Sequence, residues 1–323
     1  MPSIIHSRDS SLYSVSDLLQ WQPPPVTRII DKGIFNVGNK MLIFGDEGSW
    51  KSILTIHTAV CLANGTDWFG YSTTQCNLLK IQVELPQYSD RNRIEKYLLG
   101  HKRILEAKLL PRCKDDAERL SAHSFIKAQL ELPNMINRTD HFLHIDELAG
   151  IESLKRNIEL CLINLPSRPL VIILDPLYMI VGGDPNKNDD MKRLLQNIDL
   201  AVSDYERKGF SISTIIIHHM KKPDVDNTGR TVNGGSNDQS GTRDFQKWAD
   251  TIIRLDLDIN NSKRIGFRFT KHRNAEEDLY DFEIKWNRDT LHPQVTNRFI
   301  RHDPKEEDEA LLYGNDLLLQ LES

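Results

Sequence analysis

The fold of this chain is decided by the stretch Gly45-Asp46-Glu47-Gly48-Ser49-Trp50-Lys51-Ser52. A short apolar run, Met41–Phe44, precedes it, and a mostly apolar segment, Ile53–Ala63, follows it. This order predicts a strand, a glycine-containing loop and a helix, which together point successive backbone N–H groups at one anion. In such a phosphate-binding loop, Lys51 would reach the β- and γ-phosphates of a nucleotide, and the hydroxyl of Ser52 would ligate Mg²⁺.

Trp50 departs from the usual pattern G-x-x-x-x-G-K-[ST], which has a glycine at this position. That glycine commonly adopts backbone angles that cost a residue with a Cβ atom about 1–3 kcal/mol. Two interpretations therefore stay open on the octamer alone. One is a phosphate-binding loop with altered nucleotide affinity or turnover, and the other is an ordinary strand–turn–helix whose Lys51 is solvated.

The composition of the 323 residues is that of a soluble globular protein, with 39% hydrophobic and 27% charged residues. No apolar run approaches the roughly 18 residues of a membrane span, and the N-terminus has no signal-peptide pattern. The four cysteines are scattered without a C-x-x-C pair, which predicts reduced thiols and a cytoplasmic location. The net charge of -5 means that any nucleic-acid site must gather its cations in one loop or channel.

Alternating apolar runs and helical patterns predict an α/β fold with a mostly parallel central sheet and helices on both faces. The predicted strands are 41–44, 78–83, 142–145, 170–174, 213–217, 251–255, 264–272 and 280–286, the last two forming an antiparallel edge. The predicted helices are 53–63, a charged helical region from 88 to about 130 that is broken at Gly100 and Pro111, 151–165 and 189–208.

Three segments are expected along the chain. Residues 1–25 form an N-terminal tail with a short helix and a linker that contains Pro23-Pro24-Pro25, a stiff run that no helix continues through. Residues 26–290 form the α/β domain, with a helical insertion at about 88–135. Residues 291–323 form an acidic and leucine-rich C-terminal tail.

Two carboxylates follow predicted strands. Asp175 closes the run Leu170–Leu174, and a carboxylate at the carboxyl end of a buried parallel strand lies at the ligand-binding edge of such a sheet. We expect it to hold the Mg²⁺ shell; an Asp that only starts a turn before Pro176 is the alternative. Glu84 ends another strand, where it could orient or deprotonate a water that attacks the γ-phosphate, or be merely solvated.

His218 and His219 follow the strand 213–217. A histidine at this place could donate a hydrogen bond to the γ-phosphate and report its loss after hydrolysis. Adjacent residues of an extended chain point to opposite faces, so a metal shared by the pair is disfavoured. A pair of turn histidines is the alternative.

Residues 221–243 contain no apolar period and are rich in Gly, Asn and Ser, which is typical of a long functional loop. Its cations would bind a nucleic-acid backbone without reading sequence, because aromatic residues for base stacking are missing. A solvated polar loop is the alternative. The cations are Lys221, Lys222, Arg230 and Arg243, with Lys247 just beyond.

Lys271 and Arg273 lie at the end of a predicted strand, one residue apart. Their side chains would point the same way, and the nucleotide of a neighbouring subunit is one target for them. Surface ion pairing is the alternative.

The order of these motifs resembles that of the RecA-like P-loop ATPases, and specifically of the RepA-like and DnaB-like hexameric replicative helicases. The residues that carry the resemblance are Val171–Leu177, Gly182–Asp184, Asn188–Met191, Ile217–Lys222, Val83–Pro86, Gly241–Asp250 and Lys271–Asn274. The likeness extends over about residues 26–290.

The resemblance implies a RecA-like fold that uses ATP and Mg²⁺, with Glu84 as catalytic residue and with Lys271 and Arg273 acting in trans on a neighbour's nucleotide. It implies a homo-oligomeric ring, expected to be a hexamer, that moves single-stranded DNA with its 221–243 loop and meets other replication proteins, but no membrane. Two alternatives remain: a recombination or repair ATPase that forms open filaments, and a nucleotide-dependent regulatory or loading module with weak hydrolysis.

Overall fold

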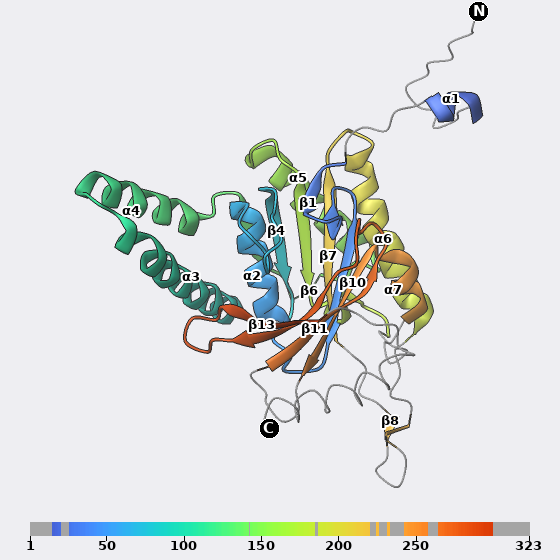
Figure 1. Ribbon diagram of the computed structural model, residues 1–323. Coiled ribbons are helices and arrows are strands. Elements are labelled where there is room, and N and C mark those ends of the chain that lie inside the picture. The colour runs from blue at the N-terminus through green and yellow to red at the C-terminus, as the bar shows by residue number, and fades with distance from the viewer. Residues whose placement is uncertain are drawn as a thin grey trace, which may run out of the picture.

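The computed structural model describes residues 15–20, 26–141, 143–184, 187–219, 224–225, 231–232, 242–257 and 264–299. Within these residues a nine-stranded sheet has the order β13-β12-β11-β10-β3-β7-β6-β4-β5 (Figure 1). Its strands are β3 (Lys40–Gly45), β4 (Asn77–Gln82), β5 (Met135–Thr139), β6 (Leu170–Asp175), β7 (Ile212–His219), β10 (Thr251–Leu257), β11 (Arg264–His272), β12 (Asp281–Trp286) and β13 (Pro293–Phe299). The helices are α1 (Val15–Gln20), α2 (Lys51–Asn64), α3 (Gln87–Leu109), α4 (Asp116–Glu131), α5 (Leu148–Asn164), α6 (Asn188–Glu206) and α7 (Thr242–Trp248).

Further short elements complete the described part: the 3₁₀ turns η1 (Leu110–Arg112) and η2 (Leu177–Ile180), the pair β1 (Arg28–Ile30) and β2 (Phe35–Asn36), and the pair β8 (Asp224–Val225) and β9 (Thr231–Val232). None of the helices in the described ranges combines the length and the apolarity needed to cross a membrane.

The six strands from β10 to β5 run parallel, and those at the centre of the sheet carry buried apolar side chains on both faces. In β3, Met41 and Ile43 belong to one hydrophobic core, while Leu42 and Phe44 belong to the other. Helix α2 packs in the first core, and α5, α6 and α7 pack in the second, so the sheet is covered on both sides (Figure 1). This double burial is why the strands are continuous apolar runs in the sequence.

The antiparallel edge is larger than expected. Strands β11 and β12 pair as predicted, and β13 adds a further antiparallel strand beside β12. The sheet thus continues into residues that we assigned to the C-terminal tail beginning at 291. Strand β13 was missed because an edge strand needs only one apolar face. Among its side chains that the structure describes, Val295 is the one that packs, partly buried, against the core.

The strand predicted at 142–145 was wrong. Leu143 and Ile145 are buried in a loop that packs on the second core, and Phe142 lies outside the described residues. The strand that pairs with β4 is β5, Met135–Thr139, which was assigned to the end of the helical insertion. Its side chains are half-buried and mostly polar, so the apolar pair nearby gave the stronger but misleading signal.

The predicted break at Gly100 was also wrong, because α3 runs unbroken through this residue. A Cβ atom there would lie 2.3 Å from the carbonyl oxygen of Thr290. Gly100 therefore serves close packing of the β12–β13 connection against α3 and does not end the helix. Helices α3 and α4 project together from the body of the molecule (Figure 1).

Candidate nucleotide-binding site

The register of the parallel strands brings several predicted site residues together at the carboxyl ends of the strands, which we call the carboxyl edge of the sheet. Gly45, the last residue of β3, pairs with His219 of β7. On the other side of β7, β6 ends at Asp175, which pairs with Gln82 of β4. Glu84 follows two residues after Gln82, so strands distant in the sequence deliver their polar ends to the same edge.

The loop between β3 and α2 has the backbone expected of a phosphate-binding loop. Trp50 adopts the left-handed conformation, with φ 62° and ψ 23°, as the glycine that it replaces commonly does. Its ring stacks on Trp286 of β12, with centroids 5.8 Å apart and planes inclined by 8°. Such a stack contributes about 0.5–1.5 kcal/mol beyond area burial, which offsets part of the roughly 1–3 kcal/mol of backbone strain.

Lys51 opens α2 with its side chain folded back into the loop. The ammonium donates hydrogen bonds to the carbonyl oxygens of Gly45 and Asp46 and to Oγ of Ser49. Burial lowers the pKa of Lys51 to about 8, against the raising effects of Asp46 and Asp175. An anion bound in the loop would favour the charged form of this lysine.

Ser52 and Asp175 offer the hard oxygen donors that Mg²⁺ prefers. Asp175 is 2% exposed. Burial raises the pKa of its carboxyl group to about 6, although the charge of Lys80 and a hydrogen bond with Ser52 act to lower it. Because a buried carboxylate gains from a neighbouring cation, these residues fit a magnesium ion held jointly by protein and nucleotide phosphates.

Glu84 is oriented by two residues that sequence reasoning missed. The hydroxyl of Tyr178 donates to Oε1 of Glu84 at 3.1 Å. Oε1 of Gln82 accepts from the backbone N–H of Glu84 at 2.9 Å, and its Nε2 lies 3.4 Å from Oδ2 of Asp175. Gln82 thus links the two carboxylate positions. The sequence signal available for it was a polar residue near the end of the apolar run 78–83.

The two histidines point to opposite sides, as an extended chain requires. His219 lines the cavity beside the loop and contacts the ring of Tyr178. Burial and the charge of Lys51 lower the pKa of His219, which favours the neutral form of its ring. His218 is buried against Phe245 of α7, which makes it a contact between β7 and the α7 side of the sheet.

A cavity of about 620 Å³ opens over the loop. Its polar part is formed by Lys51, Ser52, Glu84 and His219. One face of α3 forms a further wall that we did not predict, although the helical spacing i, i+3, i+4, i+7 was available as a signal. The residues of this face are Ser89, Asn92, Arg93 and Lys96.

A buried ion pair holds the first turn of α3 against the sheet. Nζ of Lys80 on β4 lies 3.0 Å from both carboxylate oxygens of Asp90. Asn137 of β5 donates to Asp90 at 2.8 Å. Because both charges are buried, breaking this pair would leave an unpaired buried charge, which is strongly unfavourable. The pair therefore keeps α3 in place beside the loop.

Lys271 and Arg273 lie at the other end of the parallel strands, near the start of β3. Thr251 pairs with Met41 at the start of β3 and with His272 at the end of β11. The four steps along the strand from Met41 to Gly45 span roughly 13 Å at ~3.3 Å each. Within one chain, these two cations are therefore remote from the phosphate-binding loop.

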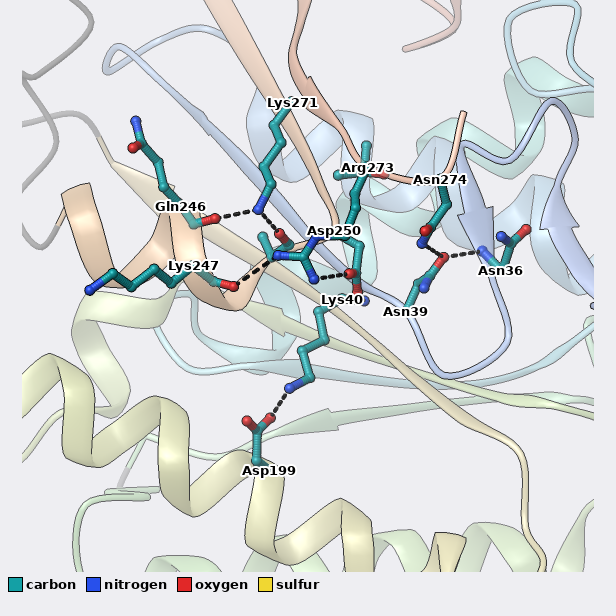
Figure 2. Close-up of polar contacts among 12 residues, drawn as sticks. Asn36, Asn39, Lys40, Asp199, Gln246, Lys247, Asp250, Lys271, Arg273 and Asn274 are labelled. Carbon is teal, nitrogen blue, oxygen red and sulfur yellow. Dashed lines mark hydrogen bonds and ion pairs between the residues drawn. The ribbon is translucent and has the colours of Figure 1, made fainter. Parts of the chain in front are cut away.

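Both cations are held by the end of α7. Lys271 donates to the carbonyl oxygens of Gln246 and Ala249. Arg273 donates to Oδ1 of Asp250 at 2.9 Å and to the carbonyl oxygen of Lys247 at 3.2 Å (Figure 2). They satisfy carbonyl groups that a helix C-terminus leaves without intrahelical partners.

The cations predicted to contact DNA fall at or beyond the limits of the described residues. Lys221, Lys222 and Arg230 lie outside the described residues, and Arg243 belongs to the first turn of α7 with its side chain outside the description.

Together, the mostly parallel sheet, the loop ahead of α2 and the polar strand ends define a P-loop ATPase domain of the RecA-like class. The family model described as "AAA domain" matches residues 7–225, which is more than half of the chain. The chain belongs to this AAA-domain family. A comparison with curated proteins found no match.

Two solved structures share the fold. One, described as an ATPase domain, is 11% identical with a TM-score of 0.52, over 80% of this chain and 85% of that one. The other, a DnaB-like replicative helicase described with its interactions with primase, is 11% identical with a TM-score of 0.51, over 79% of this chain. The match spans 57% of that helicase chain. The predicted RecA-like α/β fold is confirmed.

Proposed function

We propose that this protein is an ATP-dependent motor on single-stranded DNA, acting as the core of a replicative helicase. The observation that carries the proposal is the edge where Lys51, Ser52, Asp175, Glu84 and His219 converge. Lys51 would bind the phosphates, Ser52 and Asp175 would hold Mg²⁺ and its water shell, and Glu84 would position the attacking water. Mg²⁺ would supply neutralisation of the charge on the phosphates.

His219, the last residue of β7, would contact the γ-phosphate. Loss of the γ-phosphate would then change the position of the 221–243 loop, which follows His219 in the chain. Movement of that loop, through Lys221, Lys222, Arg230 and Arg243, would carry the DNA.

The positions of Lys271 and Arg273 support an oligomer. Lys271 and Arg273 are remote from the loop of their own chain, so they would reach a nucleotide only across an interface between subunits. Such a head-to-tail interface closes into a ring or continues as a filament. We infer a ring, expected to be a hexamer, in the cytoplasm, with replication proteins such as primase as partners; the structural likeness to a DnaB-like helicase supports this choice.

The experiment that tests the proposal is ATP hydrolysis by the purified protein with and without single-stranded DNA, at low salt because phosphate contacts weaken as salt rises. We expect strong stimulation by DNA, and closed rings in electron micrographs with ATP. Stimulated turnover with open filaments would instead identify a recombination or repair ATPase.

A second candidate is a nucleotide-dependent regulatory or loading module with weak hydrolysis. The strained Trp50 and the Lys51 ammonium bound to the loop's own carbonyl groups favour it. Tight ATP binding without DNA-stimulated turnover would select this candidate and reject the motor.

A further inference from the structure

The cavity over the loop has an apolar end that the phosphate chemistry does not use. Trp50, Ile53 and Leu291 line it. Ile53 belongs to α2, and Leu291 belongs to the connection between β12 and β13. A triphosphate and its Mg²⁺ would occupy the polar end at Lys51 and Ser52, which leaves the apolar end for another part of the ligand.

Trp50 is held rigidly at this apolar end. Trp286 covers one face of its ring in a nearly parallel stack and is itself buried. Trp50 remains only partly buried and lines the cavity. Since both backbone conformation and ring packing fix its position, the indole would bind a flat ligand without losing side-chain freedom.

Helix α3 also lines this cavity, with Ser89 and Asn92. A hydroxyl and an amide side chain can donate and accept hydrogen bonds, as the edge of a nucleobase requires. The cavity thus combines an aromatic face, hydrogen-bonding side chains and a phosphate-binding loop, which are the three kinds of contact that a nucleotide needs.

We propose that Trp50 is the platform on which the base of the bound nucleotide stacks, so that base, Trp50 and Trp286 form three parallel layers. The residue that breaks the loop consensus then has a binding role that glycine could not supply. This inference rests on the proposed nucleotide binding at Lys51, and it concerns the base end of the same site.

The test compares the dissociation constants of ADP and of inorganic pyrophosphate for the full chain with Trp50→Asn, Trp50→Gly and Trp50→Phe. Asn and Gly both accept the left-handed conformation and remove the ring, whereas Phe retains an aromatic face. We expect Trp50→Asn and Trp50→Gly to bind ADP about 5- to 150-fold more weakly. Trp50→Phe should stay close to wild type. The ratio of the ADP to the pyrophosphate dissociation constant should rise by this factor only in the two variants that lack the ring.

Equal losses for ADP and pyrophosphate would overturn the inference, because they would indicate a general change in the loop. Unchanged ADP affinity in Trp50→Asn would overturn it as well. If the variants do not fold, the wild-type protein still decides: ADP should quench tryptophan emission and pyrophosphate should not, and equal responses would reject the stack.

Neither measurement needs hydrolysis or DNA, so the inference and the proposed function fail separately. Lys51→Ala serves as the reference. If it binds pyrophosphate and ADP as tightly as wild type, the phosphate site and the proposed function both fall. If binding depends on Lys51 but not on the Trp50 ring, only the inference fails.

Discussion

The two ends of the parallel strands, the carboxyl edge and the opposite edge of the sheet, hold their cations in similar ways but with different consequences. At the carboxyl edge Lys51 is bound to loop carbonyl groups and lines a cavity with Glu84 and His219. At the opposite edge Lys271 and Arg273 are bound to the end of α7, outside that cavity. Under the proposed function, a single chain therefore assembles only part of the positive charge for phosphoryl transfer, and a neighbouring subunit would supply the rest.

The largest expected effect is at the carboxyl edge. Lys51→Ala should abolish ATP hydrolysis, because it removes the cation that neutralises the β- and γ-phosphates. Steady-state phosphate release is the measurement. Lys40→Ala is the matched control: Lys40 begins β3, the strand whose other end leads into the loop, and forms an ion pair with Asp199 at 2.7 Å (Figure 2). This variant should retain turnover. Undiminished turnover in Lys51→Ala would show that the site of ATP hydrolysis does not lie at the carboxyl edge.

The next effect tests whether the opposite edge acts across an interface. Arg273→Ala should lower turnover by about 10³–10⁵-fold if it supplies the transition-state cation, with ADP affinity largely retained. Mixtures with wild-type subunits should then hydrolyse ATP less than a linear average predicts. Arg268→Ala is the control, since Arg268 lies on β11, which ends one residue before Arg273, in a partly exposed pair with Asp256. Solvent-accessible pairs contribute little. Strictly additive activity in the mixtures would argue for independent subunits.

A smaller loss is expected at Glu84. Glu84→Gln keeps the shape and the contact with Tyr178 but cannot accept a proton, so turnover should fall about 10²–10⁴-fold. Binding of ADP, measured in parallel, should not change. Tyr178→Phe should give a weaker loss, because it removes only the hydroxyl that orients Glu84. A loss of ADP affinity in Glu84→Gln would indicate a structural role for this residue.

The smallest effect concerns the packing behind the cavity. His57 of α2 contacts Tyr97 of α3, and the ring of His292 packs against both. Burial lowers the pKa of His57 to about 3 and that of His292 to about 4. Below the unfolded value of about 6.5, the unfolded chain binds more protons than the folded one. Stability should therefore fall as the pH drops from 6.5 to 4.

The unfolding midpoint measured across this pH range checks the prediction, with His57→Asn as the comparison. Asn can still hydrogen-bond the Tyr97 hydroxyl but does not titrate, so its curve should be flatter. Identical slopes for both proteins would mean that other groups control the acid response.

Local sequence signals were sufficient for the loop and for most of the sheet. The apolar runs ahead of Lys51 and Asp175 predicted β3 and β6, because strands buried on both faces carry few polar residues. The same reasoning failed at Met135–Thr139 and Pro293–Phe299, since edge strands bury one face weakly and resemble loops or tails. Gly100 misled for a related reason: close packing against Thr290, not helix termination, explains it.

Sequence alone was enough to identify a phosphate-binding type of loop, two carboxylates at strand ends and a pair of histidines, in the order found in P-loop ATPases. Each of these motifs is recognised from a few neighbouring residues. Only the tertiary structure decided which of them meet. Strand order and register placed His219 in the cavity and His218 behind it, joined Gln82 to Asp175, and brought Trp286 under Trp50. These contacts connect residues up to more than two hundred positions apart, and the packing of the whole sheet sets them.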